Sequence, residues 1–166
     1  MSEEAFDYVR RSVAKHATVD DDSLLEELRI TRDKELPLMQ FLFRIFGKPC
    51  FPRGELVAVT GKAKSGKTLF TSMLMACCVR DEVLQVQRPF DDVDGTWECH
   101  PIRCLWYDTE QSEQSTQDIL KNRVLRLADD ADFYDIFNVR CLHYEERLRL
   151  FEKAVRKYHP DLVLLD

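Results

Sequence analysis

The sequence predicts an α/β fold in which a parallel sheet is flanked by helices and preceded by a helical segment. Three observations support this prediction. From Pro52 onward, short runs rich in β-branched residues alternate with helical patterns, as in a parallel sheet wrapped by helices. The first 50 residues show helical spacing of their apolar side chains. A turn-rich Gly47-Lys48-Pro49 separates the two regions, so we expect a helical segment at 1–50 and an α/β domain at 51–166.

The composition is that of an ordinary globular protein of one domain. The chain has 166 residues, of which 45% are hydrophobic and 33% charged. It contains no apolar run of the roughly 18 residues that a membrane span needs, and no secretory signal follows its acidic start. We therefore expect a cytoplasmic protein without membrane contact. The net charge of -6 argues against coating of nucleic acid by bulk charge but leaves room for a local basic groove.

Three helices are expected in the first region. Ser2 can cap the first, whose apolar residues recur at steps of three and four, namely Ala5, Phe6, Val9 and Val13. An acidic triplet, Asp20-Asp21-Asp22, precedes a second helix with Leu24, Leu25 and Leu28. The triplet suits the positive end of a helix better than a metal site. The third helix is expected at Leu38–Phe46, packed onto the following domain through Phe41, Leu42, Ile45 and Phe46.

Four strands and three helices are expected in the second region. The first strand, Glu55–Thr60 with the sequence ELVAVT, is dense in β-branched residues and leads into a loop over 61–68. A polar excursion over 80–101 interrupts the alternation. The remaining elements are helix Leu69–Val79, strand Ile102–Asp108, helix Ser115–Leu127, strand Phe137–His143, helix Glu145–Tyr158 and strand Asp161–Asp166.

The loop GKAKSGKT at 61–68 fits the phosphate-loop pattern G-x-x-x-x-G-K-[ST] at every fixed position, between an expected strand and an expected helix. Glycines let the backbone fold around an anion, and the helix that begins near Lys67 adds free N–H donors and a positive dipole end. Lys67 would reach the β- and γ-phosphates, and Thr68 would ligate Mg²⁺. The expected nucleotide-binding residues are Gly61, Lys62, Ala63, Lys64, Ser65, Gly66, Lys67, Thr68 and Leu69.

Two acidic groups follow expected strands and can complete a hydrolytic site. Asp166 ends the aliphatic run VLLD, at the sheet edge where a phosphate loop lies, and is a candidate Mg²⁺ ligand. Asp108 ends the strand whose last residues are WYD, and Glu110 lies two positions later, so strand alternation would point both to the same side if the strand geometry continued. Glu110 could activate water for attack on the γ-phosphate. Ordinary surface acids at a strand end are the alternative.

The ordered set GKAKSGKT, CLWYDTEQS, VRCLHY and PDLVLLD resembles the RecA-like ATPase core, and within it the RepA-like and DnaB-like hexameric helicase ATPases of mobile elements. The resemblance covers about residues 36–166. It implies that Lys67 and Thr68 are the Walker A lysine and threonine, Asp166 the Walker B aspartate and Glu110 the catalytic base. It also implies ATP and Mg²⁺ as ligands, a hexameric homo-oligomer and DNA as a partner.

The family's core continues beyond the Walker B strand, so we expect this chain to be a fragment with an incomplete sheet. In RecA-like sheets the next strand lies between the Walker B and Walker A strands. Unpaired backbone groups there would cost roughly 1 to 3 kcal/mol for each buried group. We expect the gap to be closed by association with another chain, by a swapped element, or by the fourth strand pairing directly with the first.

Three functions remain open. The leading one is an ATP-binding and ATP-hydrolysing module of a DNA-associated ATPase for replication or mobilisation of a mobile element. The alternative is a non-hydrolysing, nucleotide-dependent loader or regulatory module, and a small-molecule kinase is a third. The basic residues that could contact DNA are interleaved with Glu145, Glu146 and Glu152, which favours a solvated helix face at least as strongly. They are Arg140, Arg147, Arg149, Lys153, Arg156 and Lys157.

The six cysteines are scattered and show no spacing of a zinc or redox motif. Cys99 and Cys104 with His100 could hold a metal in principle. Free thiols in a reducing compartment are the favoured interpretation.

Overall fold

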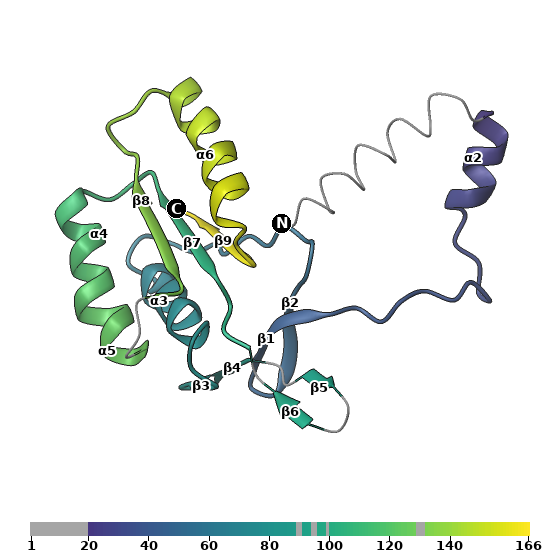
Figure 1. Ribbon diagram of the computed structural model, residues 1–166, viewed down its shortest axis with the longest axis horizontal. Helices are drawn as coiled ribbons and strands as arrows, with labels where there is room; N and C mark the ends of the chain where they lie inside the picture. Colours follow the sequence, from purple (N-terminus) through teal and green to yellow (C-terminus); the bar gives the residue numbers. More distant parts are fainter. Residues whose placement is uncertain (1–19, 89–90, 94–95, 99, 129–131) are drawn as a thin grey trace. The chain divides into compact units, whose positions relative to one another are not determined.

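Figure 1 shows a computed structural model that describes residues 20–88, 91–93, 96–98, 100–128 and 132–166. The chain divides into two units, Met1–Leu38 and Met39–Asp166. The first expected helix, with Ala5 and Val13, lies outside the described residues. None of the helices in the described ranges is long and apolar enough to cross a membrane.

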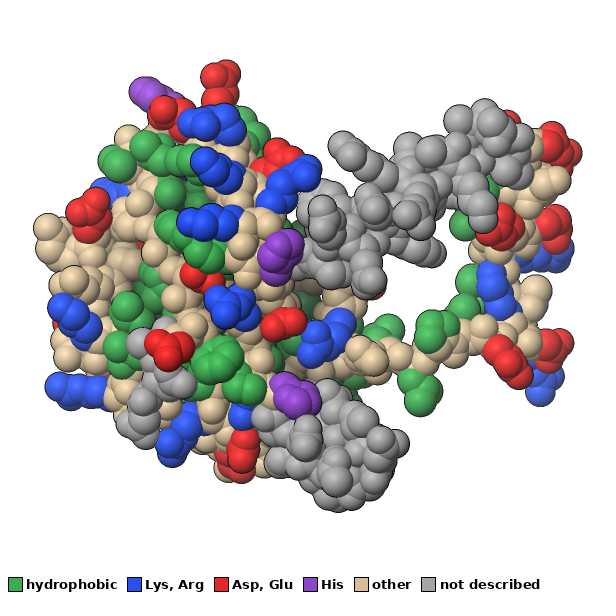
Figure 2. All heavy atoms as spheres, in the orientation of Figure 1, with side chains coloured by type: hydrophobic (Ala, Val, Ile, Leu, Met, Phe, Trp, Pro, Cys, Tyr) green, Lys and Arg blue, Asp and Glu red, His purple; other side chains and the backbone are tan. Residues whose placement is uncertain are grey.

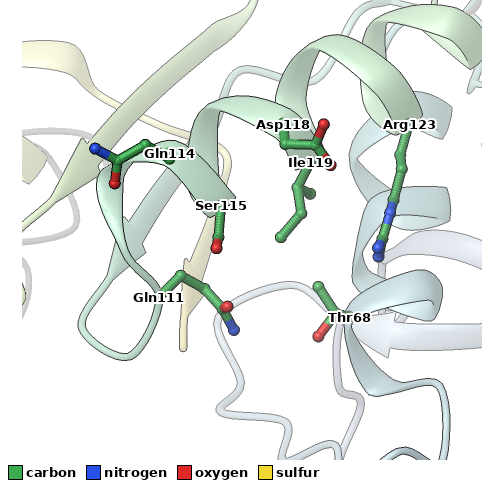
Figure 3. A pocket seen from close by; sticks show the side chains of 7 residues that line it. All are labelled: Thr68, Gln111, Gln114, Ser115, Asp118, Ile119 and Arg123. Carbon is green, nitrogen blue, oxygen red and sulfur yellow. The ribbon is translucent and has the colours of Figure 1, made fainter.

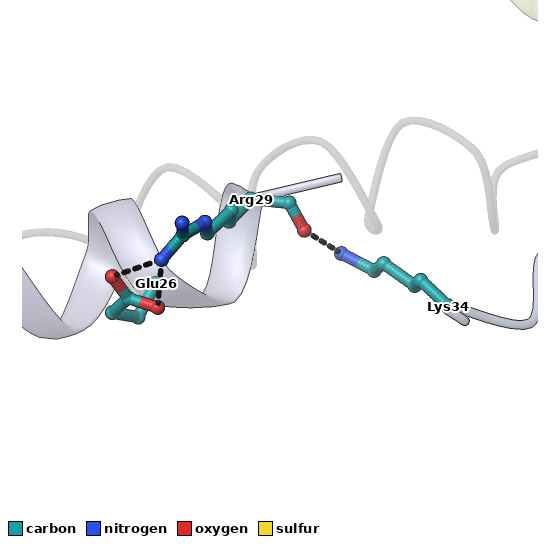
Figure 4. Close-up of polar contacts among 3 residues, drawn as sticks. All are labelled: Glu26, Arg29 and Lys34. Atoms are coloured by element: carbon teal, nitrogen blue, oxygen red, sulfur yellow. Dashed lines mark hydrogen bonds and ion pairs between the residues drawn. The ribbon is translucent and has the colours of Figure 1, made fainter. Parts of the chain in front are cut away.

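The first unit contains the expected second helix, α2 (Asp21–Leu28). Asp20 is its N-cap residue but makes no side-chain capping bond, while Asp21 and Asp22 occupy the first turn. Their charges therefore act on the helix dipole. At the other end, Arg29 pairs with Glu26 at 3.2 Å, and Lys34 Nζ donates to the Arg29 carbonyl at 3.2 Å (Figure 4). These contacts are exposed, so they contribute little to stability.

A three-stranded parallel sheet forms the centre of the second unit and confirms the predicted α/β class. Its order is β8 (Tyr134–Asn138), β7 (Cys104–Asp108) and β9 (Leu162–Leu165). Every residue of β7 is buried. Its side chains alternate between two cores, because successive strand residues point to opposite faces: Cys104 and Trp106 belong to one, Leu105 and Tyr107 to the other.

Helices cover both faces of this sheet (Figure 1). The core around Trp106 is closed by α3 (Lys67–Cys77) and by a second helical run. That run consists of α4 (Glu113–Ile119), a π-helical turn η1 (Leu120–Val124) and α5 (Leu125–Ala128). The core around Tyr107 is closed by α6 (Tyr144–Tyr158), through residues such as Ala154 and Phe151. The three predicted crossover helices are thus confirmed.

An antiparallel sheet packs against α3, and it corrects the expected helix Leu38–Phe46. Its strands, in order, are β2 (Lys48–Pro52), β1 (Phe41–Ile45), β4 (Val86–Gln87) and β3 (Glu82–Val83). Phe46 and Gly47 join β1 to β2 with φ of 50° and 73°. Two positive φ values in a two-residue loop match the twist of a hairpin. Leu42 and Phe43 are both buried, so the helical spacing of the aromatic residues was misleading.

Residues 55–60 differ from the prediction as well, since they form no strand and are exposed, Leu56 at 99%. A strand needs a neighbour for its N–H and C=O groups. Among the described residues β9 pairs with β7 alone, so the expected direct pairing of Asp161–Asp166 with Glu55–Thr60 is wrong. Association with another chain stays a prediction.

The structure contains two further strands that were not predicted and one predicted strand that lies at different residues. The excursion over 80–101 contains a hairpin of β5 (Asp91–Val93) and β6 (Thr96–Glu98). The third strand of the parallel sheet was expected at Phe137–His143 but lies at Tyr134–Asn138. Its register places Asn138 beside Asp108, at the carboxyl edge of the sheet.

Candidate functional site

The loop 61–68 has the backbone shape that its two fixed glycines require. A Cβ on Gly61 would lie 2.5 Å from Ser65 Oγ, so a side chain there would force Ser65 to shift where the loop closes on itself. Gly66 is the N-cap residue of α3 with φ of 91°, a left-handed conformation that favours glycine. Between them, Ser65 N–H donates to the Lys62 carbonyl at 3.2 Å and tightens the turn.

Lys67 spans this loop from the first turn of α3. Its Nζ donates to the carbonyls of Gly61 at 3.0 Å and Lys62 at 3.3 Å. The ammonium group is therefore held over the loop by weak neutral acceptors. A phosphate oxygen is a stronger partner for an ammonium group than a carbonyl.

The N-terminus of α3 directly follows the loop 61–68. The first backbone bond of the helix runs from Phe70 N–H to the Gly66 carbonyl at 2.9 Å. The N–H groups of Lys67, Thr68 and Leu69 precede this bond and lie outside the α-helical ladder. Such free N–H groups and the helix dipole form an anion site when a phosphate-binding loop leads into them.

The carboxyl ends of β7 and β9 meet beside the loop. Thr109 donates to the Asp166 carbonyl from both its N–H and its Oγ1, each at 2.7 Å. Burial raises the pKa of the Asp166 carboxyl above its ordinary value, the charges of Glu110 and Asp108 raise it further, and Lys67 opposes them. Thr68 at the start of α3 and Gln111 after β7 line one pocket, so the phosphate loop also lies beside this edge of the sheet.

Asp108 and Glu110 do not share one environment, contrary to the expectation from strand alternation. β7 ends at Asp108, and the chain bends at Thr109. Asp108 is completely buried, whereas Glu110 is exposed. Because the strand geometry does not continue, only Glu110 is available to a solvent molecule or ligand.

A polar pocket of about 380 Å³ opens between the start of α3 and the α4 side. In Figure 3, Thr68 lies on one side, and Gln111, Ser115 and Arg123 extend toward it from the other. The pocket is lined by Thr68, Gln111, Gln114, Ser115, Asp118, Ile119 and Arg123. It is large enough for the nucleoside part of a nucleotide.

The sequence analysis missed the α4 side of this pocket. Gln111, Ser115 and Asp118 recur at steps of four and three residues directly after Glu110. A polar stripe at helical spacing, beginning where a strand ends at the phosphate loop, is the signal that would have found it.

No group of three or more His, Cys, Asp or Glu side chains that could hold a metal ion exists among the described residues. The Cys99, His100 and Cys104 alternative cannot be followed further, since Cys99 lies outside them. Among the described cysteines, Cys50, Cys78, Cys104 and Cys141 are free thiols, and the Cys77 thiol donates to the Val86 carbonyl at 3.4 Å.

Comparisons with known proteins agree with this geometry. Residues 44–166 match a family described as an AAA domain, a span that includes the phosphate loop and the whole parallel sheet. The chain is also 29% identical over 127 residues to the circadian clock protein KaiC2 of Synechocystis sp.. The aligned part is 74% of this chain but 19% of that relative, so the chain spans about a fifth of its length. No solved structure matches significantly.

Proposed function

Because the chain belongs to the AAA domain family, we propose that it binds ATP with Mg²⁺ and hydrolyses it. Membership of this family indicates a P-loop nucleotide-binding domain. The observation that carries the hydrolytic proposal is that the phosphate loop lies beside the carboxyl ends of β7 and β9. Thr68 and Gln111 line one pocket, and Thr109 donates to the Asp166 carbonyl at 2.7 Å. A cation, an exposed carboxylate and a metal-binding carboxylate at one edge are the parts that phosphoryl transfer to water requires.

Each side chain receives a role from its position. Lys67 would exchange the carbonyls of Gly61 and Lys62 for phosphate oxygens. Thr68 and Asp166 would hold Mg²⁺ through the oxygen ligands that this ion prefers, and the ion would neutralise phosphate charge when bound. Glu110 would accept the proton of the attacking water. The pocket beside Thr68 would take the nucleoside.

Turnover of the Glu110→Gln variant tests this proposal. Glutamine keeps the shape of the side chain but cannot accept a proton, so we expect kcat for ATP to fall by about 10² or more. Nucleotide affinity is expected to stay within about twofold, because the phosphate loop is unchanged. Glu145→Gln, on the exposed face of α6, is the matched control and is expected to keep full turnover. Equal turnover of Glu110→Gln and the unaltered chain would contradict the proposal.

A finer proposal is that the ATPase acts on DNA, as a homo-oligomer, in replication or mobilisation of a mobile element. It rests on the resemblance to RepA-like and DnaB-like ATPases. The basic residues of α6 give it little support. Arg147 donates to the carbonyls of Arg140 and Leu142 at 2.6 and 2.8 Å, and Arg156 pairs with Glu152 at 2.7 Å. Basic and acidic side chains are interspersed on the face seen in Figure 2.

The alternative is a nucleotide-dependent regulatory module, and the similarity to a circadian clock protein favours it. Single-stranded DNA separates the two proposals. The DNA-associated ATPase predicts that DNA raises the rate of ATP turnover in the intact protein. An unaltered rate with DNA would favour the regulatory module, and binding of ATP without any Glu110-dependent turnover would establish it as non-hydrolysing.

A further inference from the structure

Asp108 is a buried carboxylate whose partners are all on one short stretch of chain. Its Oδ1 accepts the backbone N–H of Glu110 at 3.0 Å and of Gln111 at 2.9 Å. Its Oδ2 accepts the Thr116 hydroxyl at 2.5 Å. A buried carboxylate is costly unless it is paired or hydrogen-bonded, and these three donors meet that need. The same bonds fix the backbone on either side of the Glu110 carbonyl.

Asn138 extends the network from the neighbouring strand. It lies beside Asp108 in the parallel register of β7 and β8. Its Nδ2 donates to Thr116 Oγ1 at 2.8 Å and to the Gln111 carbonyl at 3.0 Å. Because a hydroxyl has one proton and two acceptor sites, Thr116 can accept from Asn138 while it donates to Asp108. The amide, hydroxyl and carboxylate form one directed chain, in which each bond strengthens the next.

The result is an exposed Glu110 side chain on an anchored backbone. Asp108 holds the N–H groups of residues 110 and 111, and Asn138 holds the carbonyl of residue 111. Three different elements, β7, α4 and β8, thereby supply the anchors. A misplacement of about 1 Å can cost an enzyme about 10² in rate, so such anchoring matters most for a residue that must orient water.

We propose that Asp108, Thr116 and Asn138 are positioning residues that hold Glu110 against the nucleotide site. This inference rests on the proposed role of Glu110 as the base for ATP hydrolysis. We assign Asp108 no contact with substrate, because it is fully buried and accepts three hydrogen bonds inside the protein.

Thr116 variants test the inference. Thr116→Val removes the central hydroxyl at nearly constant volume, and we expect kcat to fall about 10-fold to 100-fold while nucleotide affinity stays within about twofold. Thr116→Ser keeps the hydroxyl and is expected to restore most of the rate. Amide hydrogen exchange of Glu110 and Gln111 should speed up about tenfold in Thr116→Val and return in Thr116→Ser. That exchange is a readout of the anchor that does not depend on turnover.

A double-substitution cycle separates positioning from general loss of structure. If Thr116 acts through Glu110, Thr116→Val has no further effect on kcat in a Glu110→Gln background. An equal loss in both backgrounds would overturn the inference, as would unchanged kcat and exchange in a folded Thr116→Val chain. Should Thr116→Val fail to fold, the same cycle is measured with Asn138→Ala. That variant removes the bonds to Thr116 and to the Gln111 carbonyl but keeps the bond from Thr116 to Asp108. Full turnover in Glu110→Gln alone would instead overturn the proposed function.

Discussion

Asp108 and Glu110 are separated by one residue, yet their carboxyl groups have opposite surroundings. Asp108 ends a strand that is buried on both faces, and backbone and hydroxyl donors surround it. Glu110 follows a bend and is exposed. The residue types alone could not distinguish the two, because the difference depends on the position at which β7 ends. Asp108 is thus enclosed by donors of the protein, whereas the Glu110 side chain is accessible to solvent.

Tyr107 tests the packing of α6 on its face of the parallel sheet. Its hydroxyl donates to the Arg147 carbonyl at 2.7 Å, and the side chain is 2% exposed. Burial raises the pKa of Tyr107 above its ordinary value, against a smaller opposite effect of Arg147. The neutral phenol is therefore stabilised in the folded chain. The neutral phenol adds fully to the free energy of unfolding below the unfolded-state pKa of about 10. This stabilisation is lost as the pH rises through the higher pKa of the folded chain.

We therefore expect Tyr107→Phe to lower the free energy of unfolding by about 1 kcal/mol at pH 8. The difference from the unaltered chain should shrink above a pH of about 10. Urea unfolding of the two chains at pH 8 and above a pH of about 10 measures this difference in the free energy of unfolding. Tyr144→Phe, where the side chain is 73% exposed, is the control and is expected to change nothing. A difference that is the same at both pH values would contradict the assignment.

At the scale of elements, the β1–β2 hairpin depends on its turn. Gly47 has φ of 73° and open space around the position of a Cβ, so the cost of a side chain there is conformational. Gly47→Ala is expected to destabilise the chain by about 1 kcal/mol in urea unfolding. Gly47→Asn should cost less, because asparagine adopts left-handed backbone more readily. Equal losses in the two variants would mean that the turn has another conformation.

The elements that could be predicted are those whose pattern agrees with their packing. The buried run CLWYD became β7, and the amphipathic run ending at Tyr158 became α6. The segment Phe41–Ile45 could not be assigned by spacing, because Leu42 and Phe43 are both buried and the alternation is hidden. Residues 55–60 have the composition of a strand, but composition supplies no neighbour for the backbone.

The candidate site divides in the same way. The phosphate loop was predictable, because its residue types follow from the need to wrap an anion. The pocket wall on α4 and the bond from Asn138 to the Gln111 carbonyl were not predictable from the sequence. Both depend on which strand lies beside β7 and in which register.

At the scale of the whole molecule, cysteine exposure tests the packing of the layers. Cys77, Cys78 and Cys104 are buried, Cys50 is half-buried and Cys141 is exposed. Burial first, and then the neighbouring Cys104 and Cys77, hold the pKa of the Cys78 thiol well above its ordinary value. Since the thiolate is the reactive form, Cys78 should resist alkylation.

Brief N-ethylmaleimide treatment of a Cys99→Ser chain, followed by mass spectrometry, measures the order in which the described cysteines are alkylated. Cys141 is expected to react first and Cys50 more slowly, with the three buried thiols reacting only in denaturant. Early labelling of Cys78 or Cys104 in the native chain would show that α3 does not pack on the sheet as described.

The site as a whole joins the loop 61–68, the turn after β7 and the end of β9, which are far apart in sequence. Thr68 and Gln111 line one pocket, and Thr109 donates to the Asp166 carbonyl at the carboxyl edge of the sheet. Ligands of α/β sheets bind at such carboxyl edges. The central claim is that this edge binds the phosphates of ATP.

Calorimetric titration of the chain with Mg²⁺ and a non-hydrolysable ATP analogue tests that claim most directly. We expect binding by the unaltered chain and by the control Lys48→Ala, whose side chain is exposed on β2. Binding should be abolished by Lys67→Ala, which removes the cation that spans the loop. Equal binding by Lys67→Ala, or no binding by the unaltered chain, would contradict the account.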